Sequence, residues 1–133
     1  MLATTRAIPT VKTTIWAGRI LSAFAMLFLA FDSLIKVLNL APAVEATTQL
    51  GYGASVVITL GLLELICLAI SVIPRTAIPG AILLTGYLGG AIATQVRAGS
   101  SLFSVIFPVI IGALIWGGLF LRDERLRALL LQR

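Results

Sequence analysis

Asp32 and Lys36 stand four residues apart in a segment that is otherwise almost wholly apolar, "WAGRILSAFAMLFLAFDSLIKVL" (16–38). An aspartate one helical turn before a lysine is the favourable order for an ion pair along a helix. Glu64 lies in the middle of a second apolar segment, "ASVVITLGLLELICLAISVI" (54–73). Carboxyl and ammonium groups in apolar surroundings can transfer protons or bind the polar head of a ligand. Which of these roles is possible depends on the helices that carry the three residues and on the solvent around those helices.

The composition identifies the solvent of those elements as lipid. Hydrophobic residues make up 59% of the 133 residues and charged residues only 11%, with a mean hydropathy of +1.10. A soluble domain has about 25% charged residues. The net charge of +5 comes from basic residues at the ends of apolar runs, which is typical of membrane orientation and not of nucleic-acid binding.

The missing ligand types argue against several classes of enzyme. The chain has no histidine and a single cysteine, Cys67. The usual haem ligand, the commonest zinc ligand and a paired redox cysteine are therefore all lacking. We expect no metal site and no cofactor.

Hydropathy divides the chain into four segments long enough to cross a bilayer. They cover about 15–39, 54–73, 77–96 and 102–121, and the connections between them are short. Short connections make neighbouring helices antiparallel. We predict one all-α domain over 1–133, an integral membrane four-helix bundle with up-down-up-down topology.

The end of the first segment decides where Asp32 and Lys36 lie. A helix that stopped at Phe31 would have only about 17 apolar residues, the lower limit for crossing. Apolar residues continue beyond it, and no glycine or proline occurs before Pro42. We therefore expect the helix to continue to about residue 39, with both charged groups inside the membrane. Lys36 can extend to the surface, whereas the short Asp32 side chain needs a partner.

Basic residues near the segment ends predict the orientation. One side carries eight of them and the other side only Lys36 and Arg97. The positive-inside rule then places both termini in the cytoplasm. We expect Arg19 and Arg97 to extend to the headgroups. The eight residues are Arg6, Lys12, Arg19, Arg75, Arg122, Arg125, Arg127 and Arg133.

Small residues predict where helices approach closely. Gly86 and Gly90 have GxxxG spacing, Gly89 and Ala93 repeat it, and Gly112, Ala113, Gly117 and Gly118 lie in the last segment. Such residues permit close backbone contact. Packing within the chain is the favoured interpretation, and a homodimer interface is the alternative.

Depth in the membrane groups the polar residues. An ionisable group in a span costs about 2.5–3.5 kcal/mol, so each is a candidate for function. At about 1.5 Å per residue, Asp32, Glu64 and Tyr87 reach similar depths, with Gln95 nearer the outer surface. Glu64 must be protonated, paired or next to water. A neutral carboxyl that links two helices is the structural alternative. We predict a polar cluster that opens outward past Lys36 and Gln95.

These residues carry a resemblance to a known family. "FDSLIK", "APAVEATTQLGYG", "LGLLELICLAI", "IPRTAIPGAILLTGYLGGAIATQVRAGSSLF" and "WGGLFLRDERLRALL" together resemble the DoxX-like family of small four-helix bacterial membrane proteins. The resemblance implies a bacterial inner-membrane protein, similar to a quinone-linked membrane subunit and associated with a redox partner protein. Relatives often carry histidine where this chain has Gln95, which leaves that position a hydrogen-bonding role.

Several functions remain open at this point. The first is a subunit that binds a quinone or another hydrophobic small molecule through Asp32, Lys36, Glu64, Tyr87, Gln95 and Arg97. The second is a cofactor-independent acid–base enzyme, an isomerase, cyclase or epoxide-opening enzyme, in which Asp32 and Glu64 are catalytic. The third is a small proton-coupled transporter, and the fourth is a scaffold for a neighbouring complex.

Overall fold

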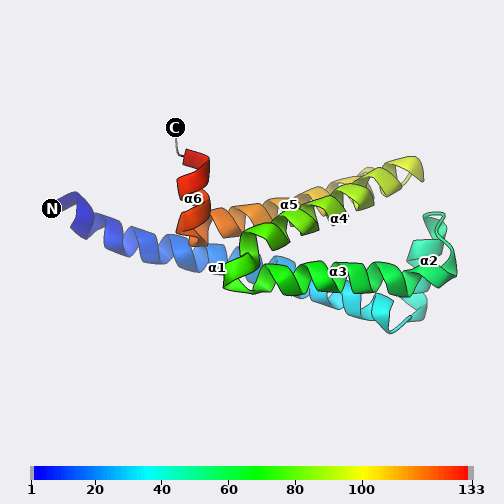
Figure 1. Ribbon diagram of the computed structural model, residues 1–133. Helices are drawn as coiled ribbons and strands as arrows, with labels where there is room; N and C mark the ends of the chain where they lie inside the picture. The colour runs from blue at the N-terminus through cyan, green and yellow to red at the C-terminus, as the bar shows by residue number, and fades with distance from the viewer. Residues whose placement is uncertain (1, 132–133) are drawn as a thin grey trace.

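The computed structural model describes residues 2–131, with side chains from Lys12 to Leu131. The side chains of Arg6 and Arg133, used above for orientation, lie outside this range. The described chain is helical and contains no strand (Figure 1). Its elements are α1 (Leu2–Val37), α2 (Ala41–Gln49), η1 (Ala54–Val56), α3 (Val57–Val72), η2 (Pro74–Thr76), α4 (Ala77–Arg97), α5 (Leu102–Arg122) and α6 (Glu124–Leu131).

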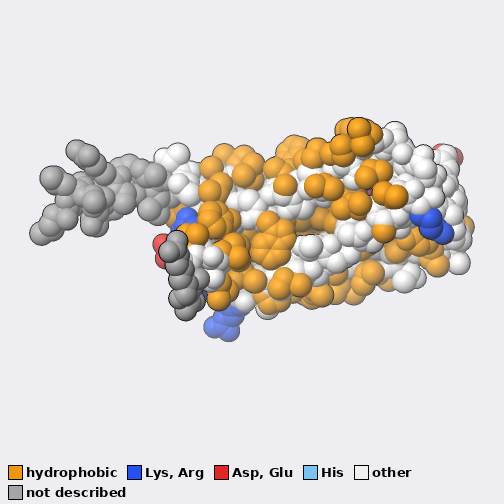
Figure 2. Space-filling view, turned by 90° about the horizontal axis from the view of Figure 1, so that it is seen from above, with side chains coloured by type: hydrophobic (Ala, Val, Ile, Leu, Met, Phe, Trp, Pro, Cys, Tyr) orange, Lys and Arg blue, Asp and Glu red, His pale blue; other side chains and the backbone are white. Residues whose placement is uncertain are grey.

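Four helical segments are long and apolar enough to cross a membrane. They are Lys12–Val37, Ala54–Val72, Pro74–Arg97 and Leu102–Arg122. Large apolar side chains such as Phe24, Leu27 and Phe31 point outward, and a broad hydrophobic band separates the basic ends of the face seen in Figure 2. Apolar side chains on the outside are expected where lipid replaces water. The predicted all-α membrane bundle is confirmed.

The first helix ends earlier than expected because of Asn39. Its φ of 56° is left-handed, and the Leu40 amide donates to the Ile35 carbonyl. This six-residue bond around a left-handed residue is the usual helix stop, in which asparagine can replace glycine. The helix therefore ends at Val37, still beyond Asp32 and Lys36. The following segment, expected to be a plain connection, contains α2.

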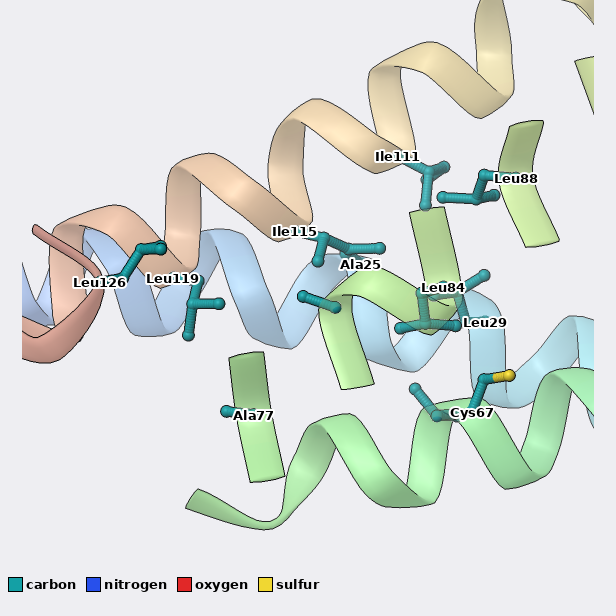
Figure 3. Close-up of a cluster of buried hydrophobic side chains, with 12 residues drawn as sticks. Ala25, Leu29, Cys67, Ala77, Leu84, Leu88, Ile111, Ile115, Leu119 and Leu126 are labelled. Atoms are coloured by element: carbon teal, nitrogen blue, oxygen red, sulfur yellow. The ribbon is translucent and has the colours of Figure 1, made fainter. Parts of the chain in front are cut away.

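The four long helices surround one apolar core. Helix α1 packs against α3 and α5, and α4 packs against the same two helices from the other side. Leu29, Leu84, Ile111 and Leu119 are almost fully buried in this core (Figure 3). Toward the end that carries α2, the α4–α5 pair diverges from α1 and α3 (Figure 1).

Most of the close helix contacts occur at glycines that the sequence analysis did not name. A Cβ at Gly61 would lie 2.7 Å from Lys36 Cβ and 2.8 Å from the Val37 amide nitrogen. Gly80 touches Ser71 in the same way, and Gly118 touches Ser22. The prediction of packing within the chain is thus correct for Gly118.

The same prediction is wrong for Gly86, Gly89 and Gly90 of α4. A Cβ at Gly86, Gly89 or Gly90 would meet no atom within 4 Å, and the same is true of Gly117. Gly86 and Gly90 instead border a cavity. The physical reason is the divergence of α4 from α1 and α3, which leaves Gly86 and Gly90 beside open space.

The glycine contacts generate a stability prediction. Gly61→Ala forces α1 and α3 apart, so we expect a lower melting temperature in detergent. Gly89→Ala is the matched control, because it meets no atom and should gain up to about 1 kcal/mol of helix propensity. Equal melting temperatures for the two variants would contradict the close α1–α3 contact.

Candidate functional site

Lys36 is the centre of a polar cluster between the spanning helices α1, α3 and α4. Its Nζ donates to Asp32 Oδ2 at 2.7 Å and to Glu64 Oε1 at 3.2 Å. A third bond runs to the Tyr87 hydroxyl at 2.9 Å. An ammonium group has three N–H donors, so all of them are used within the chain. The side chain therefore turns into the bundle and does not extend to the surface as expected.

Glu64 is the most enclosed member of the cluster. Its side chain is only 1% exposed, and Oε1 also accepts a bond from the Tyr87 hydroxyl at 3.2 Å. The second oxygen, Oε2, is buried and has no hydrogen-bond partner among the described residues. A buried acceptor without a partner costs about 1–3 kcal/mol, and more when charged. The cluster therefore has room for one more proton or donor.

Local structure explains why these side chains meet. Asp32 and Lys36 are one turn apart on α1, so they lie on the same face. Gly61 lets that face approach α3 at Lys36, and Glu64 follows Gly61 by three residues on the same side of α3. Tyr87 completes the cluster from α4. The predicted convergence of three helices is present in the structure.

A cavity of about 490 Å³ adjoins the cluster. It lies between the diverging ends of the helices, and Phe28, Leu63, Phe103 and Phe107 contribute to its apolar walls. Asp32 lines it with 30% of its side chain exposed, whereas Lys36 keeps only 15%. The volume is in the range of small-molecule sites, about 300–1,000 Å³. Asp32 is thus the acid that a bound molecule would meet first.

The remaining predicted residues separate into two groups. Gln95 lines the cavity together with Asp32, Lys36, Glu64 and Tyr87. Arg97 does not line it. Its guanidinium donates to the Leu50 carbonyl at 2.9 Å and so fastens the end of α2 to α4. Its role in the structure is a tie between segments.

Sequence reasoning missed the contribution of α2 and the segment after it. Thr47 and Leu50 line the outer part of the cavity, and Tyr52 joins α4 through a 3.0 Å bond to Thr94. Only the tyrosine between two glycines, "GYG", gave a local signal. An aromatic residue in such a turn indicates that the turn packs against another segment.

The cluster can hold a proton, accept hydrogen bonds and orient a polar group. Two carboxyls share one ammonium, so full ionisation leaves a net charge of −1 in a region of low dielectric. Such a charge is neutralised by a proton or by a ligand. Among the described residues no group of three histidine, cysteine, aspartate or glutamate side chains is arranged to hold a metal.

Removal of the Lys36 ammonium should destabilise the fold, because that group neutralises part of the charge of two carboxyls. We expect Lys36→Met to lower the free energy of unfolding by about 3–5 kcal/mol, because two carboxyls lose their shared partner. The triple variant Asp32→Asn, Lys36→Met, Glu64→Gln should recover most of that loss, since no charge is then buried. Reversible unfolding in mixed micelles measures both. A stable single variant, or a triple variant no better than the single one, would contradict the account.

Comparison with known proteins agrees with this architecture. No curated protein and no solved structure shows a significant match to the chain. A family model, that of the DoxX-like family, matches residues 20–118. The match includes Asp32, Lys36, Glu64, Tyr87 and the cavity between them. The chain is a member of the DoxX-like family.

Proposed function

We propose that this membrane protein binds a lipophilic small molecule in the 490 Å³ cavity, with the polar head of that molecule hydrogen-bonded to Asp32. The observation that carries the proposal is the position of the ion cluster at the wall of an apolar cavity. A cavity with apolar walls and a few convergent polar groups is the usual form of a ligand site. An ion pair that served packing alone would not need the adjoining space.

The unused hydrogen-bonding groups of the cluster indicate whether the polar head of the ligand donates or accepts. The three donors of Lys36 are used, and the hydroxyl hydrogen of Tyr87 is directed to Glu64. At the ion cluster itself the capacity that remains is for acceptance, at the exposed part of Asp32 and at Glu64 Oε2. A head with a hydroxyl or amine donor satisfies these oxygens. A head with carbonyl groups alone would have to displace Lys36 from an existing bond in order to bind at the ion cluster, and would otherwise depend on a donor elsewhere in the wall, such as the Gln95 amide.

Among the molecules that the family resemblance suggests, the unused acceptors of Asp32 and Glu64 favour a quinol over a quinone. The two phenolic hydroxyls of a quinol are donors, whereas the oxidised form offers only acceptors. A role beside a redox partner protein, in a bacterial inner membrane with both termini cytoplasmic, is consistent with this choice. Basic residues concentrated at one end of the bundle support that orientation.

The test compares the two oxidation states of one ligand. Purified protein is titrated with decylubiquinol and with decylubiquinone, and retention is followed by native mass spectrometry. We expect the quinol to bind at least about tenfold more tightly, the value of one good hydrogen bond to a charged group. Asp32→Asn should reduce the difference, because an amide can also donate to a carbonyl. Glu45→Gln, on the exposed face of α2, is the control.

The outcomes separate the two parts of the proposal. Equal binding of both forms, reduced by a bulky substitution such as Gly86→Leu in the cavity wall, would retain the site and reject the donor requirement. Binding of neither form, together with no lipophilic molecule extracted from the gently purified wild type, would contradict ligand binding itself.

A second candidate function is supported by the unpaired oxygen of Glu64. A carboxyl that shares a proton with its neighbours, beside a second acid of different exposure, is an arrangement suited to acid–base catalysis on a hydrophobic substrate. In that case Asp32 exchanges the proton with the substrate and Glu64 stores it. Turnover of a ligand identified by extraction, lost in Asp32→Asn and in Glu64→Gln, would favour this function over binding alone.

A further inference from the structure

A second cavity, of about 350 Å³, lies at the other end of the bundle between α1, α3 and α5. Arg19 and Arg122 border it, and Ile15, Met26 and Val72 provide part of its apolar wall. Both arginines belong to the basic end of the bundle, where α6 and the α3–α4 turn also lie (Figure 1). The cavity thus combines two cationic groups with an apolar surface.

Among the described residues, neither guanidinium group has an acidic ion-pair partner. The three ion pairs between described residues use Lys36 and Arg125 as the basic members, not Arg19 or Arg122. No acidic side chain lines the cavity. Arg19 also repels Arg122 electrostatically, although less strongly than Asp123 attracts it. Two like charges beside a shared cavity favour an anion between them.

Asp123 is the nearest acid along the chain, and it is already engaged. It caps α6, because its Oδ1 accepts bonds from the Arg125 and Leu126 amides. The Arg125 guanidinium also binds both of its carboxylate oxygens. These bonds from Arg125 hold the pKa of Asp123 below its usual range. Asp123 attracts Arg122 electrostatically, but no hydrogen bond joins the two side chains in the described structure.

Arg122 is held in place toward α1. Its Nε donates to Ser22 Oγ at 3.0 Å, and the Gly18–Gly118 contact brings the two helices close enough for that bond. No bond from its two terminal nitrogens to another described residue is present. Ser22 follows Arg19 by three residues on α1, so both face the same side. A guanidinium fixed through Nε leaves its terminal nitrogens free to bind an anion.

The level of this cavity in the membrane matches that of lipid headgroups. Arg122 is the last residue of the α5 span, and Arg19 lies near the start of the α1 span. The Arg19 guanidinium lies 5.5 Å from the centre of the Trp16 ring, and tryptophan is enriched at the membrane interface. Basic cavities between helices at this level are known binding sites for anionic headgroups.

We infer that Arg19 and Arg122 bind the phosphate of an anionic phospholipid, with Ser22 as the positioning residue and the apolar wall as the seat of one acyl chain. A guanidinium matches two phosphate oxygens at once. The phosphate completes the charge balance that the protein leaves open at this end. This site is independent of the ligand cavity at the opposite end.

The test uses lipids that differ only in headgroup. Protein stripped of lipid in detergent is titrated with dioleoylphosphatidylglycerol or dioleoylphosphatidylcholine, and bound lipid is counted by native mass spectrometry. We expect one phosphatidylglycerol to bind at least about tenfold more tightly than phosphatidylcholine. Arg19→Gln and Arg122→Gln should each remove most of that preference. Arg75→Gln, an exposed arginine at the same end that does not line the cavity, is the control.

One more variant and one competing anion distinguish a phospholipid site from other anion binding. Arg122→Lys retains the charge and the fold but not the forked geometry, so it should keep only part of the preference. Inorganic phosphate should compete weakly, because it cannot fill the apolar wall. Full displacement by inorganic phosphate would overturn the assignment to a lipid. Equal phosphatidylglycerol binding by the Arg19, Arg122 and Arg75 variants, all equally stable, would overturn the site itself.

Discussion

The electrostatic balance around Lys36 is the constraint on which the half of this bundle that carries α2 depends. One ammonium group holds a carboxyl of its own helix, a carboxyl of α3 and a hydroxyl of α4. In lipid none of these partners can be replaced by water, so the three helices must meet at this depth. The two acids therefore require the shared ammonium, and this requirement fixes the relative positions of the three helices. The same geometry leaves one oxygen of Glu64 without a partner.

Close contact and open space alternate along the helices for a steric reason. Gly18 with Gly118, Gly61 and Gly80 allow backbones to touch at three points, and apolar side chains fill the core between them. Beyond the ion cluster no such contact joins α4 to its neighbours, and α2 covers the diverging ends. Bonds from Arg97 to Leu50 and from Tyr52 to Thr94 connect this cover to α4. The cavity exists because the bundle is tight on one side of the cluster and loose on the other.

The two cavities carry opposite charge. The cavity at the α2 end has an excess of acid, with two carboxyls for one ammonium. The cavity at the other end contains two guanidinium groups and no acid. Each cavity is therefore unbalanced in charge, and in opposite senses. A membrane protein with this distribution can hold a donor-bearing molecule within the bilayer while it contacts an anionic surface.

The sequence by itself determined the four spans, their antiparallel order and the depth of each polar residue. Length and hydropathy decide these features, because a helix must satisfy its own backbone in lipid and rises by a constant distance per residue. The position of Asp32 and Lys36 inside the first span also followed from the length that a crossing requires. Family membership followed from local sequence alone.

Only the tertiary structure decided which faces meet. Hydropathy does not set the rotation of a helix about its axis when all of its faces are apolar. The sequence could therefore suggest that Asp32, Glu64 and Tyr87 converge but could not require it. The inward turn of Lys36, the tie made by Arg97 and the open space beside Gly86 and Gly90 depend on contacts between helices far apart in sequence. The placement of Arg19 and Arg122 beside one cavity also depends on contacts between helices far apart in sequence, because Arg19 lies in α1 and Arg122 in α5.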